Sequence, residues 1–157
     1  MRIVVDDLTH PAVVALLAQH LREAEGNSPA GSVFALDLEG LRDPAVTMFS
    51  GWEDGRLLGL AALKALGDNE GEVKSMRTAP DAGRRGVGRA MLAHVVAEAR
   101  ARGYRALRLE TGSNDTFAPA RALYESAGFV PSEPFGGYVL TDFNRCYVLD
   151  LREASGD

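Results

Sequence analysis

Residues 72–92 read EVKSMRTAPDAGRRGVGRAML, and this stretch decides the fold. Its first part, residues 72–78, contains a β-branched valine and stops before a proline, which is typical of a strand. Over residues 86–102 apolar side chains recur with a period of about 3.6, and Gly103 follows as a helix stop. The stretch therefore predicts a strand, a glycine-containing loop and a helix. Alternation along the strand predicts one shared face for three side chains: Glu72, Lys74 and Met76.

Strand and helix patterns continue on both sides of this stretch. An apolar run at residues 2–5 predicts an edge strand. Residues 13–24 keep helical spacing after a Thr-His-Pro start and before Gly26-Asn27, which predicts a first helix. The other predicted elements are a short helix at 36–41, a hairpin of strands at 45–52 and 56–66, a strand at 105–111, a helix at 119–127 and a strand at 144–151. This order predicts a mixed sheet with helices on both faces.

The composition fits one packed globular domain. The chain has 157 residues, 46% of them hydrophobic and 25% charged, as expected for a single domain spanning residues 1–157. It has no run of about 20 apolar residues and no signal peptide, so we expect a cytoplasmic protein that does not bind membranes. The one cysteine, Cys146, forms no internal disulfide and has no metal-ligand spacing around it, so we expect no metal.

The net charge of −5 is unevenly distributed. Between residues 77 and 108 there are eight arginines and only two acidic residues, Asp81 and Glu98. An acidic protein with one basic block is a poor non-specific binder of nucleic acid, and we expect no nucleic-acid partner. The basic block itself suits a compact polyanion, with a solvated helix face as the equal alternative.

Glycines at the start of the predicted helix narrow the choice of polyanion. Gly86 and Gly88 allow close approach to the backbone, and a helix start leaves up to four N–H groups without intrahelical partners. With arginines nearby, such a start can bind a pyrophosphate, although an ordinary turn with surface arginines has the same pattern.

A nucleotide-hydrolysing P-loop is excluded because Arg89-Ala90 follows Gly88 in place of Lys-Ser/Thr. A dinucleotide-binding fingerprint is weak, because its third glycine would fall on Met91.

Two motifs in this order resemble the GNAT superfamily of acyl-CoA-dependent N-acetyltransferases. Residues 83–88, GRRGVG, are similar to its Arg/Gln-x-x-Gly-x-Gly/Ala signature, and residues 123–129, LYESAGF, are similar to its Leu-Tyr-Glu-x-x-Gly-Phe helix. The first signature position is Gly83, so a side-chain contribution is absent there. Three further segments, KSMR (74–77), LETGS (109–113) and PFGGY (134–138), resemble a small bacterial subgroup with poorly defined acceptors.

This resemblance implies a fold and a co-substrate. The fold is α/β (mixed α+β), with a central mixed, mostly antiparallel sheet and helices on both faces. The co-substrate is acetyl-CoA: the signature loop binds its pyrophosphate, and main-chain groups of residues 76–78 hold the pantetheine arm. Many members carry an asparagine where this chain has Phe117, so Asn114 is an alternative donor to that arm. The implied cofactor-binding residues are Met76, Arg77, Thr78, Arg84, Arg85, Gly86, Val87, Gly88, Arg89, Ala90, Asn114 and Phe117.

The resemblance also makes Tyr124 the general acid. A phenol with a pKa of ~10 can give a proton to the departing thiolate and stays neutral at pH 7; the alternative is core packing on a helix face. Glu72 lies 14 residues before Gly86, where some members carry a glutamate base that acts through water. The alternative for Glu72 is an ion pair with Lys74. The base matters less for an amine of low pKa: deprotonation at pH 7 costs about 1.1 kcal/mol at a pKa of ~7.8 and about 4.6 kcal/mol at ~10.4.

The resulting function is transfer of an acetyl group to a primary amine of a small molecule, such as an amino acid. We expect Glu110, Phe135 and Tyr138 at the acceptor site, with a strand salt bridge and a plain hairpin as the alternatives. Two other functions stay open: a non-catalytic acyl-CoA-binding sensor, and acetylation of proteins or peptides. Relatives are often dimers, which implies a homodimer. The three histidines at positions 10, 20 and 94 are expected to have no catalytic role, and Cys146 is expected in the core.

Overall fold

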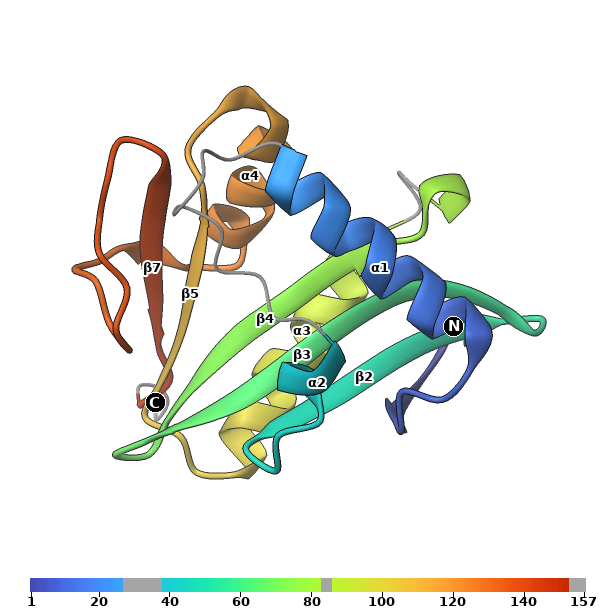
Figure 1. The fold of residues 1–157 in the computed structure, drawn as a ribbon. Helices are drawn as coiled ribbons and strands as arrows, with labels where there is room; N and C mark the ends of the chain where they lie inside the picture. The colour runs from blue at the N-terminus through green and yellow to red at the C-terminus, as the bar shows by residue number, and fades with distance from the viewer. Residues whose placement is uncertain (27–37, 83–85, 153–157) are drawn as a thin grey trace.

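The computed structural model describes residues 1–26, 38–82 and 86–152. Within them, one sheet of seven strands forms the centre of the molecule, in the order β1-β2-β3-β4-β5-β7-β6 (Figure 1). The strands are β1 (Arg2–Asp6), β2 (Val46–Glu53), β3 (Arg56–Gly67), β4 (Glu70–Thr78), β5 (Ala106–Gly112), β6 (Val130–Pro131) and β7 (Asn144–Asp150). Neighbouring strands are antiparallel except β4 and β5, which are parallel. The predicted mixed, mostly antiparallel sheet is confirmed.

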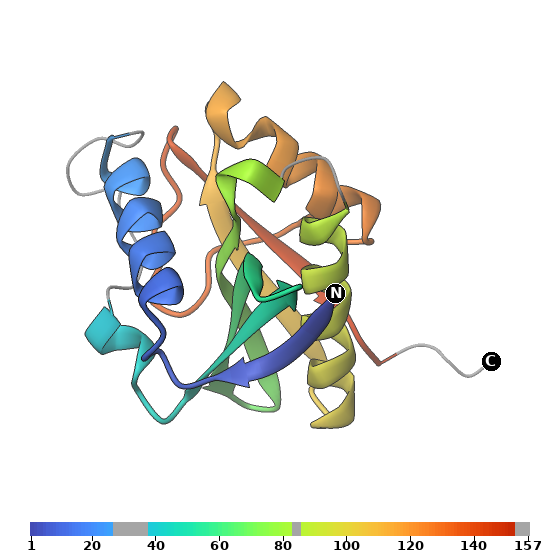
Figure 2. The same ribbon diagram turned by 90° about the vertical axis from the view of Figure 1, so that its right-hand side faces the viewer.

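Helices cover both faces of this sheet (Figure 2). One face carries α1 (Pro11–Gly26) and the short α2 (Leu38–Leu41), and the other carries α3 (Val87–Ala101) and α4 (Ala118–Ser126). Two short 3-10 helices, η1 (Pro80–Ala82) and η2 (Asp115–Phe117), and strand β6 were not predicted. Arg84, Arg85 and the first two residues of the short helix predicted at 36–41 lie outside the described residues. None of the helices in the described segments is both long and apolar enough to cross a bilayer.

Helix α3 packs closely on the centre of the sheet because β3 has a glycine beneath it. A Cβ atom at Gly59 would lie 2.8 Å from Val87 Cγ1 and 3.2 Å from Met91 Cγ. Val87 and Met91 belong to the buried stripe of α3, together with Leu92 and Val95. Any larger residue at position 59 would push the helix away from β3. This contact fixes the start of α3 next to the end of β4.

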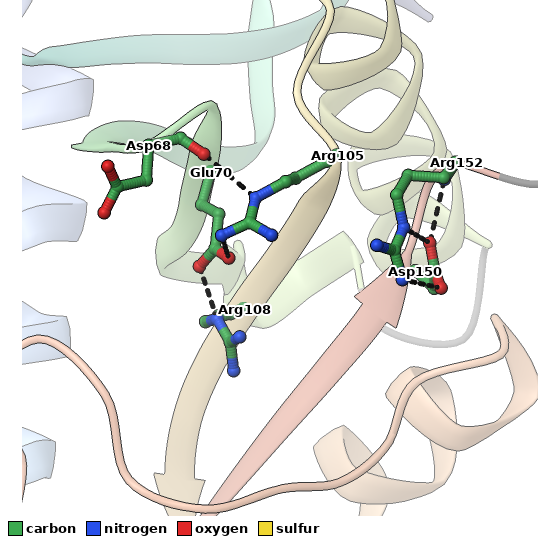
Figure 3. Close-up of polar contacts among 6 residues, drawn as sticks. All are labelled: Asp68, Glu70, Arg105, Arg108, Asp150 and Arg152. Atoms are coloured by element: carbon green, nitrogen blue, oxygen red, sulfur yellow. Dashed lines mark hydrogen bonds and ion pairs between the residues drawn. The ribbon is translucent and has the colours of Figure 1, made fainter.

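Ion pairs hold β4 to β5 where both strands begin (Figure 3). Glu70 Oε1 accepts a hydrogen bond from Arg108 Nε at 2.7 Å, and Glu70 Oε2 lies 3.0 Å from Arg105 Nη2. Arg105 Nε also donates to the carbonyl oxygen of Asp68 at 3.0 Å. Glu70 is largely buried, so these charge-assisted bonds act at reduced screening. We refer to Glu70, Arg105 and Arg108 as the strand clamp.

Beyond the strand clamp the two parallel strands separate. Residues 70–72 pair with residues 106–108, and no further pairs join the two described strands. β4 nevertheless continues to Thr78 and β5 to Gly112. In Figure 1 the two strands diverge from their common end. We refer to the part of the sheet where β4 and β5 no longer pair as the opening. Over this length, no strand of the described residues pairs with the facing edges of β4 and β5.

A β-bulge in β4 changes which side chains share a face. Ser75 has a φ of 54°, and the register against β3 shifts between Lys74 and Arg77. As a result Arg77 shares the α1 face of the sheet with Glu72 and Lys74. The predicted face of Glu72, Lys74 and Met76 was wrong at its third member, because strict alternation does not survive an inserted residue.

Candidate active site

A cavity of about 380 Å³ opens beside the part of β4 that has separated from β5. Its walls come from α1, from the end of β4, from the first turn of α3 and from η2 with α4. A volume of this size is typical of small-molecule sites. The lining residues used below are His20, Glu23, Met76, Arg77, Thr78, Gly88, Phe117 and Tyr124. All of these except His20 and Glu23 were predicted as site residues, so the fold brings six of the 17 predicted residues into one space.

The first turn of α3 presents backbone donors at this cavity. Gly86 precedes the helix with a φ of 74°, a left-handed conformation that favours glycine. Among the described residues, the first bond of the helix runs from the Ala90 N–H to the Gly86 carbonyl at 3.0 Å, and the N–H groups of residues 87–89 have no acceptor within the helix. Gly88 lines the cavity, and a Cβ atom there would lie 3.3 Å from Leu123 Cδ2. With the positive end of the helix dipole, this turn is suited to an anionic group.

Other predicted cofactor residues lie outside the cavity lining. The Val87 side chain is buried beneath α3, and Ala90 is half-buried one turn into the helix. Arg89 is exposed and lines a second cavity, between α3 and α4. Asn114 caps η2, its Oδ1 accepting the N–H of Thr116 at 3.1 Å. In this structure the Asn114 side chain therefore stabilises the start of η2.

Tyr124 combines a packing contact with access to the cavity. Its side chain lies on α4, is 7% exposed and contacts the Phe129 ring edge-on, with 6.0 Å between the ring centroids. Burial, with a smaller contribution from the charge of Glu110, raises the pKa of Tyr124 to about 12. The phenol therefore keeps its proton at neutral pH. It can act as a hydrogen-bond or proton donor toward a group in the cavity.

Glu72 lies in a buried ion pair beside the opening. Its Oε2 accepts a hydrogen bond from Tyr138 Oη at 2.6 Å, and Lys74 Nζ is 3.2 Å from the same oxygen. Lys74 Nζ also donates to Tyr138 Oη at 2.5 Å. The Glu72 and Lys74 side chains are only 4% and 9% exposed. The ion pair expected as the alternative role of Glu72 is therefore present, and burial together with Glu72 raises the pKa of Tyr138 above its usual value.

Aromatic rings cover this buried ion pair. The Phe135 and Tyr138 rings meet edge-on with 5.0 Å between their centroids. Lys74 Nζ lies 5.2 Å from the centroid of the Tyr138 ring, and the Arg108 guanidinium lies 5.9 Å from that of Phe135. Through Arg108 the aromatic segment is connected to the strand clamp.

Glu110 joins the same face of the sheet. Glu72 is aligned with Arg108 in the parallel register, and Glu110 follows Arg108 by two residues, so all three share a face. Burial raises the pKa of Glu110, while a hydrogen bond from Asn144 and the charge of Lys74 oppose this shift. The three residues predicted for the acceptor site are thus gathered around Glu72, on the α1 side of the sheet.

Cys146 is a core residue, as predicted. It pairs opposite Glu110 on β7 and is 2% exposed. Burial, with the charges of Glu110 and Glu72, raises the pKa of its thiol to about 11, so little thiolate exists at neutral pH. Within the described residues, no group of three or more His, Cys, Asp or Glu side chains could hold a metal ion.

Helix α1 supplies two cavity residues that the sequence did not identify. Glu23 Oε1 lies 2.5 Å from Arg77 Nη2, and His20 lies nearly one turn earlier on the same helix. Helical spacing shows which side chains of α1 share a stripe, but it does not show which strand that stripe contacts. The bulge that turns Arg77 toward α1 is also invisible in the alternation pattern. No signal in the sequence could therefore have placed His20 at this cavity.

A family model supports the interpretation of this geometry. The model of the acetyltransferase (GNAT) family matches residues 13–129, which include most of α1, the bulged strand, the start of α3 and Tyr124. The chain belongs to this family. GNAT membership makes the protein an acyltransferase, an N-acetyltransferase.

Two relatives extend this similarity over most of the chain. The GNAT protein is 49% identical over 138 residues to the uncharacterized N-acetyltransferase YsnE of Bacillus subtilis (strain 168), covering 88% of this chain and 91% of that protein. It is 47% identical over 148 residues to the uncharacterized N-acetyltransferase YedL of Escherichia coli (strain K12), covering 94% and 93%. A solved GNAT acetyltransferase from Elizabethkingia anophelis with acetyl-CoA bound has the same fold, with a TM-score of 0.71 at 16% identity, covering 96% of this chain and 97% of that chain.

Replacing Lys74 by methionine tests the buried ion pair. Lys74→Met leaves the Glu72 carboxylate buried without its cation, and we expect the free energy of unfolding at pH 7 to fall by about 3–5 kcal/mol. The double variant Glu72→Gln/Lys74→Met should recover much of this loss, because it removes both charges. Urea unfolding measures each value, with Arg22→Met on the exposed side of α1 as control. A Lys74→Met variant as stable as the wild type would show that the pair contributes nothing.

Proposed function

We propose that the protein transfers the acetyl group of acetyl-CoA to the primary amine of a small molecule, such as an amino acid, with Tyr124 as general acid. The observation that supports this most directly is that the first turn of α3 and Tyr124 line the same cavity. One wall suits the anionic part of the coenzyme, and another offers a protonated phenol to the leaving sulfur. The acceptor approaches from the α1 side.

Backbone groups bind the coenzyme in this proposal. The N–H groups of residues 87–89 take the pyrophosphate, with Arg84, Arg85 and Arg89 adding positive charge. β4 pairs with β3 along one edge up to Thr78, while its other edge has lost β5. Unpaired N–H and C=O groups on that edge of residues 76–78 can hold an extended pantetheine arm as a neighbouring strand would. The acetyl-CoA bound by the Elizabethkingia anophelis relative supports this choice of co-substrate.

The transfer requires one bond to form and one to break. The neutral amine nitrogen attacks the thioester carbonyl carbon, a C–N bond forms, and the C–S bond breaks. Tyr124 donates its proton to the sulfur, and the nitrogen loses a proton to a base. The pKa of Tyr124, about 12, lies above that of a free thiol, ~8.5. The step is therefore completed when the proton taken from the nitrogen returns to the phenolate.

Glu72 is the base that the family resemblance suggests, acting through water. Its Oε2 is already an acceptor for Tyr138 and Lys74. Hydrogen bonds to a carboxylate stabilise the charged form and weaken it as a base. An amine that is easily deprotonated is therefore the best acceptor for a site with a weak base. An α-amine with a pKa of ~7.8 costs only about 1.1 kcal/mol to deprotonate at pH 7, which favours amino acids.

Glu110, Phe135 and Tyr138 form the acceptor side of the proposed site. They lie on the α1 face beside Lys74, so buried groups of both signs stand next to two aromatic rings. An acceptor with an ammonium and a carboxylate group matches both signs. A free amino acid meets this requirement, whereas an internal peptide residue does not.

A panel of acceptors tests the proposed function. Purified protein is incubated with acetyl-CoA and free amino acids, simple alkylamines or short peptides, and release of the CoA thiol is measured. We expect release with at least one free amino acid and none with peptides. Acetyl-CoA binding without turnover on any amine would indicate a sensor instead. Activity confined to peptides would indicate a protein acetyltransferase.

Tyr124→Phe removes the proposed proton donor with little change in ring packing. We expect kcat to fall by about 10²-fold or more, because the thiolate then leaves unprotonated, while acetyl-CoA affinity stays near that of the wild type. Thiol release gives kcat, and calorimetry gives the affinity. Tyr104→Phe, at a half-buried tyrosine outside the cavity, is the matched control. An unchanged kcat in Tyr124→Phe would leave this residue with a packing role only.

Gly88→Asp tests the first turn of α3. The new carboxylate would stand next to the amides of residues 87–89 and repel the pyrophosphate, so we expect acetyl-CoA affinity to fall by about 10²-fold or more. Gly88→Ala adds bulk near Leu123 without charge and should lose less. Ala101→Asp, exposed at the far end of α3, adds the same charge away from the cavity and should bind normally. Calorimetry that finds unchanged affinity in Gly88→Asp would exclude this binding site.

A further inference from the structure

The α1 wall of the cavity carries a histidine that the proposed reaction has not used. All three histidines of the chain lie in described residues, and among them His20 lines the cavity with Tyr124. His10 accepts the N–H of Ala12 at its Nδ1 and stacks edge-on against Trp52. His94 packs edge-on against Phe49. Only His20 therefore has access to a group bound between α1 and α4.

The surroundings of His20 keep its imidazole neutral. Burial lowers its pKa first, and the positive charge of Arg77 on β4 lowers it further. Glu23 on α1 opposes this, but that carboxylate is already bound to Arg77 at 2.5 Å. The remaining titratable group of the cavity wall is Tyr124 on α4, whose phenol is protonated at neutral pH. A neutral imidazole has a free nitrogen lone pair, which a proton acceptor requires.

We propose that His20 is the base that removes the proton from the acceptor amine during acetyl transfer. This inference rests on the proposed function. The nitrogen of the amine attacks the thioester carbonyl carbon, the C–N bond forms, and an imidazole nitrogen of His20 takes one proton from the amine. The C–S bond breaks, and the sulfur takes the proton of Tyr124. The imidazolium then returns its proton to the phenolate, so both residues regain their starting states.

The geometry favours His20 over Glu72 in this role. Glu72 is 3% exposed, and its Oε2 accepts hydrogen bonds from Tyr138 and Lys74. Among the described residues that line the cavity, Glu72 is absent, whereas His20 and Tyr124 are both present. A base and an acid on opposite walls can act on the two ends of one reacting centre. Glu72 instead stabilises Lys74 and Tyr138 on the acceptor side.

The pH dependence of kcat/KM separates the two bases. With an amino-acid acceptor, protonation of the amine alone makes log kcat/KM fall with a slope of one as the pH decreases. Protonation of His20 adds a second unit of slope below its pKa, which lies under the usual ~6.5. We expect this steeper limb, the part of the pH profile with a slope of two, in the wild type, in Glu72→Gln and in the control His94→Gln. In His20→Gln we expect a slope of one throughout and a kcat/KM about 10²-fold lower at pH 8.

Two further measurements show that His20→Gln acts on proton transfer. Calorimetry should find acetyl-CoA affinity within about twofold of the wild type, since His20 is not a ligand of the pyrophosphate. In His20→Ala, free imidazole can enter the space left by the side chain, and we expect the rate to rise with imidazole concentration. Imidazole should not stimulate His94→Ala. Rescue that follows the concentration of neutral imidazole, and not of imidazolium, shows that the missing group is a base.

The outcomes distinguish this inference from the function on which it rests. Wild-type protein that transfers acetyl groups to no amine would overturn both. Wild-type activity together with an unchanged rate and pH slope in His20→Gln would overturn the role of His20 alone. Loss of the steeper limb in Glu72→Gln, with His20→Gln retaining it, would assign the base to Glu72. A His20→Gln variant that fails to fold leaves the decision to imidazole rescue of His20→Ala, whose absence would also overturn the role.

Discussion

The pairing between β4 and β5 ends early, and the position of the cavity follows from this. The strand clamp holds the two parallel strands together over residues 70–72 and 106–108, and the bulge at Ser75 then bends β4 away. An intact sheet would hydrogen-bond these edges to each other. Here the main-chain groups of residues 76–78 face an opening instead. Unpaired backbone N–H and C=O groups raise the free energy of the folded state unless a ligand or neighbouring side chains bind them. The early loss of pairing therefore has a structural cost.

This opening also explains how helices on opposite faces of the sheet reach one cavity. In a continuous sheet, α1 and α4 would be separated by the full thickness of the strand layer, and their side chains would not meet. Because β4 and β5 diverge, His20 of α1 and Tyr124 of α4 line the same space. The first turn of α3 joins them because Gly59 and Gly88 let that helix approach β3 and α4 closely. In the proposed function, one face of the sheet therefore serves the coenzyme and the other serves the acceptor.

Around this cavity, single titratable groups are neutral and charged side chains are paired. The titratable groups that line the cavity without an ion pair, His20 and Tyr124, are both held neutral by burial. Formal charges occur as pairs: Arg77 with Glu23, and Lys74 with Glu72. Buried pairs add little net stability, but removal of one partner is expensive, so they fix the positions of their strands and helices. In the proposed transfer, the imidazolium of His20 and the phenolate of Tyr124 carry opposite charges, and both groups become neutral again when the proton returns.

The sequence by itself determined the local elements and the chemistry that depends on short spacing. The 3.6-residue period of α3, the glycines at its start and the LYESAGF segment around Tyr124 are local features, and the structure has a helix start and a buried tyrosine at these places. Other features depend on contacts between residues far apart in the chain. Only the tertiary structure decided that Arg77 replaces Met76 on the α1 face, that Glu72 is bound to Tyr138, and that His20 lies at the cavity. The physical reason is that a bulge, a strand separation and the packing of α1 are set by long-range register and close contacts, which leave no periodic trace in the sequence.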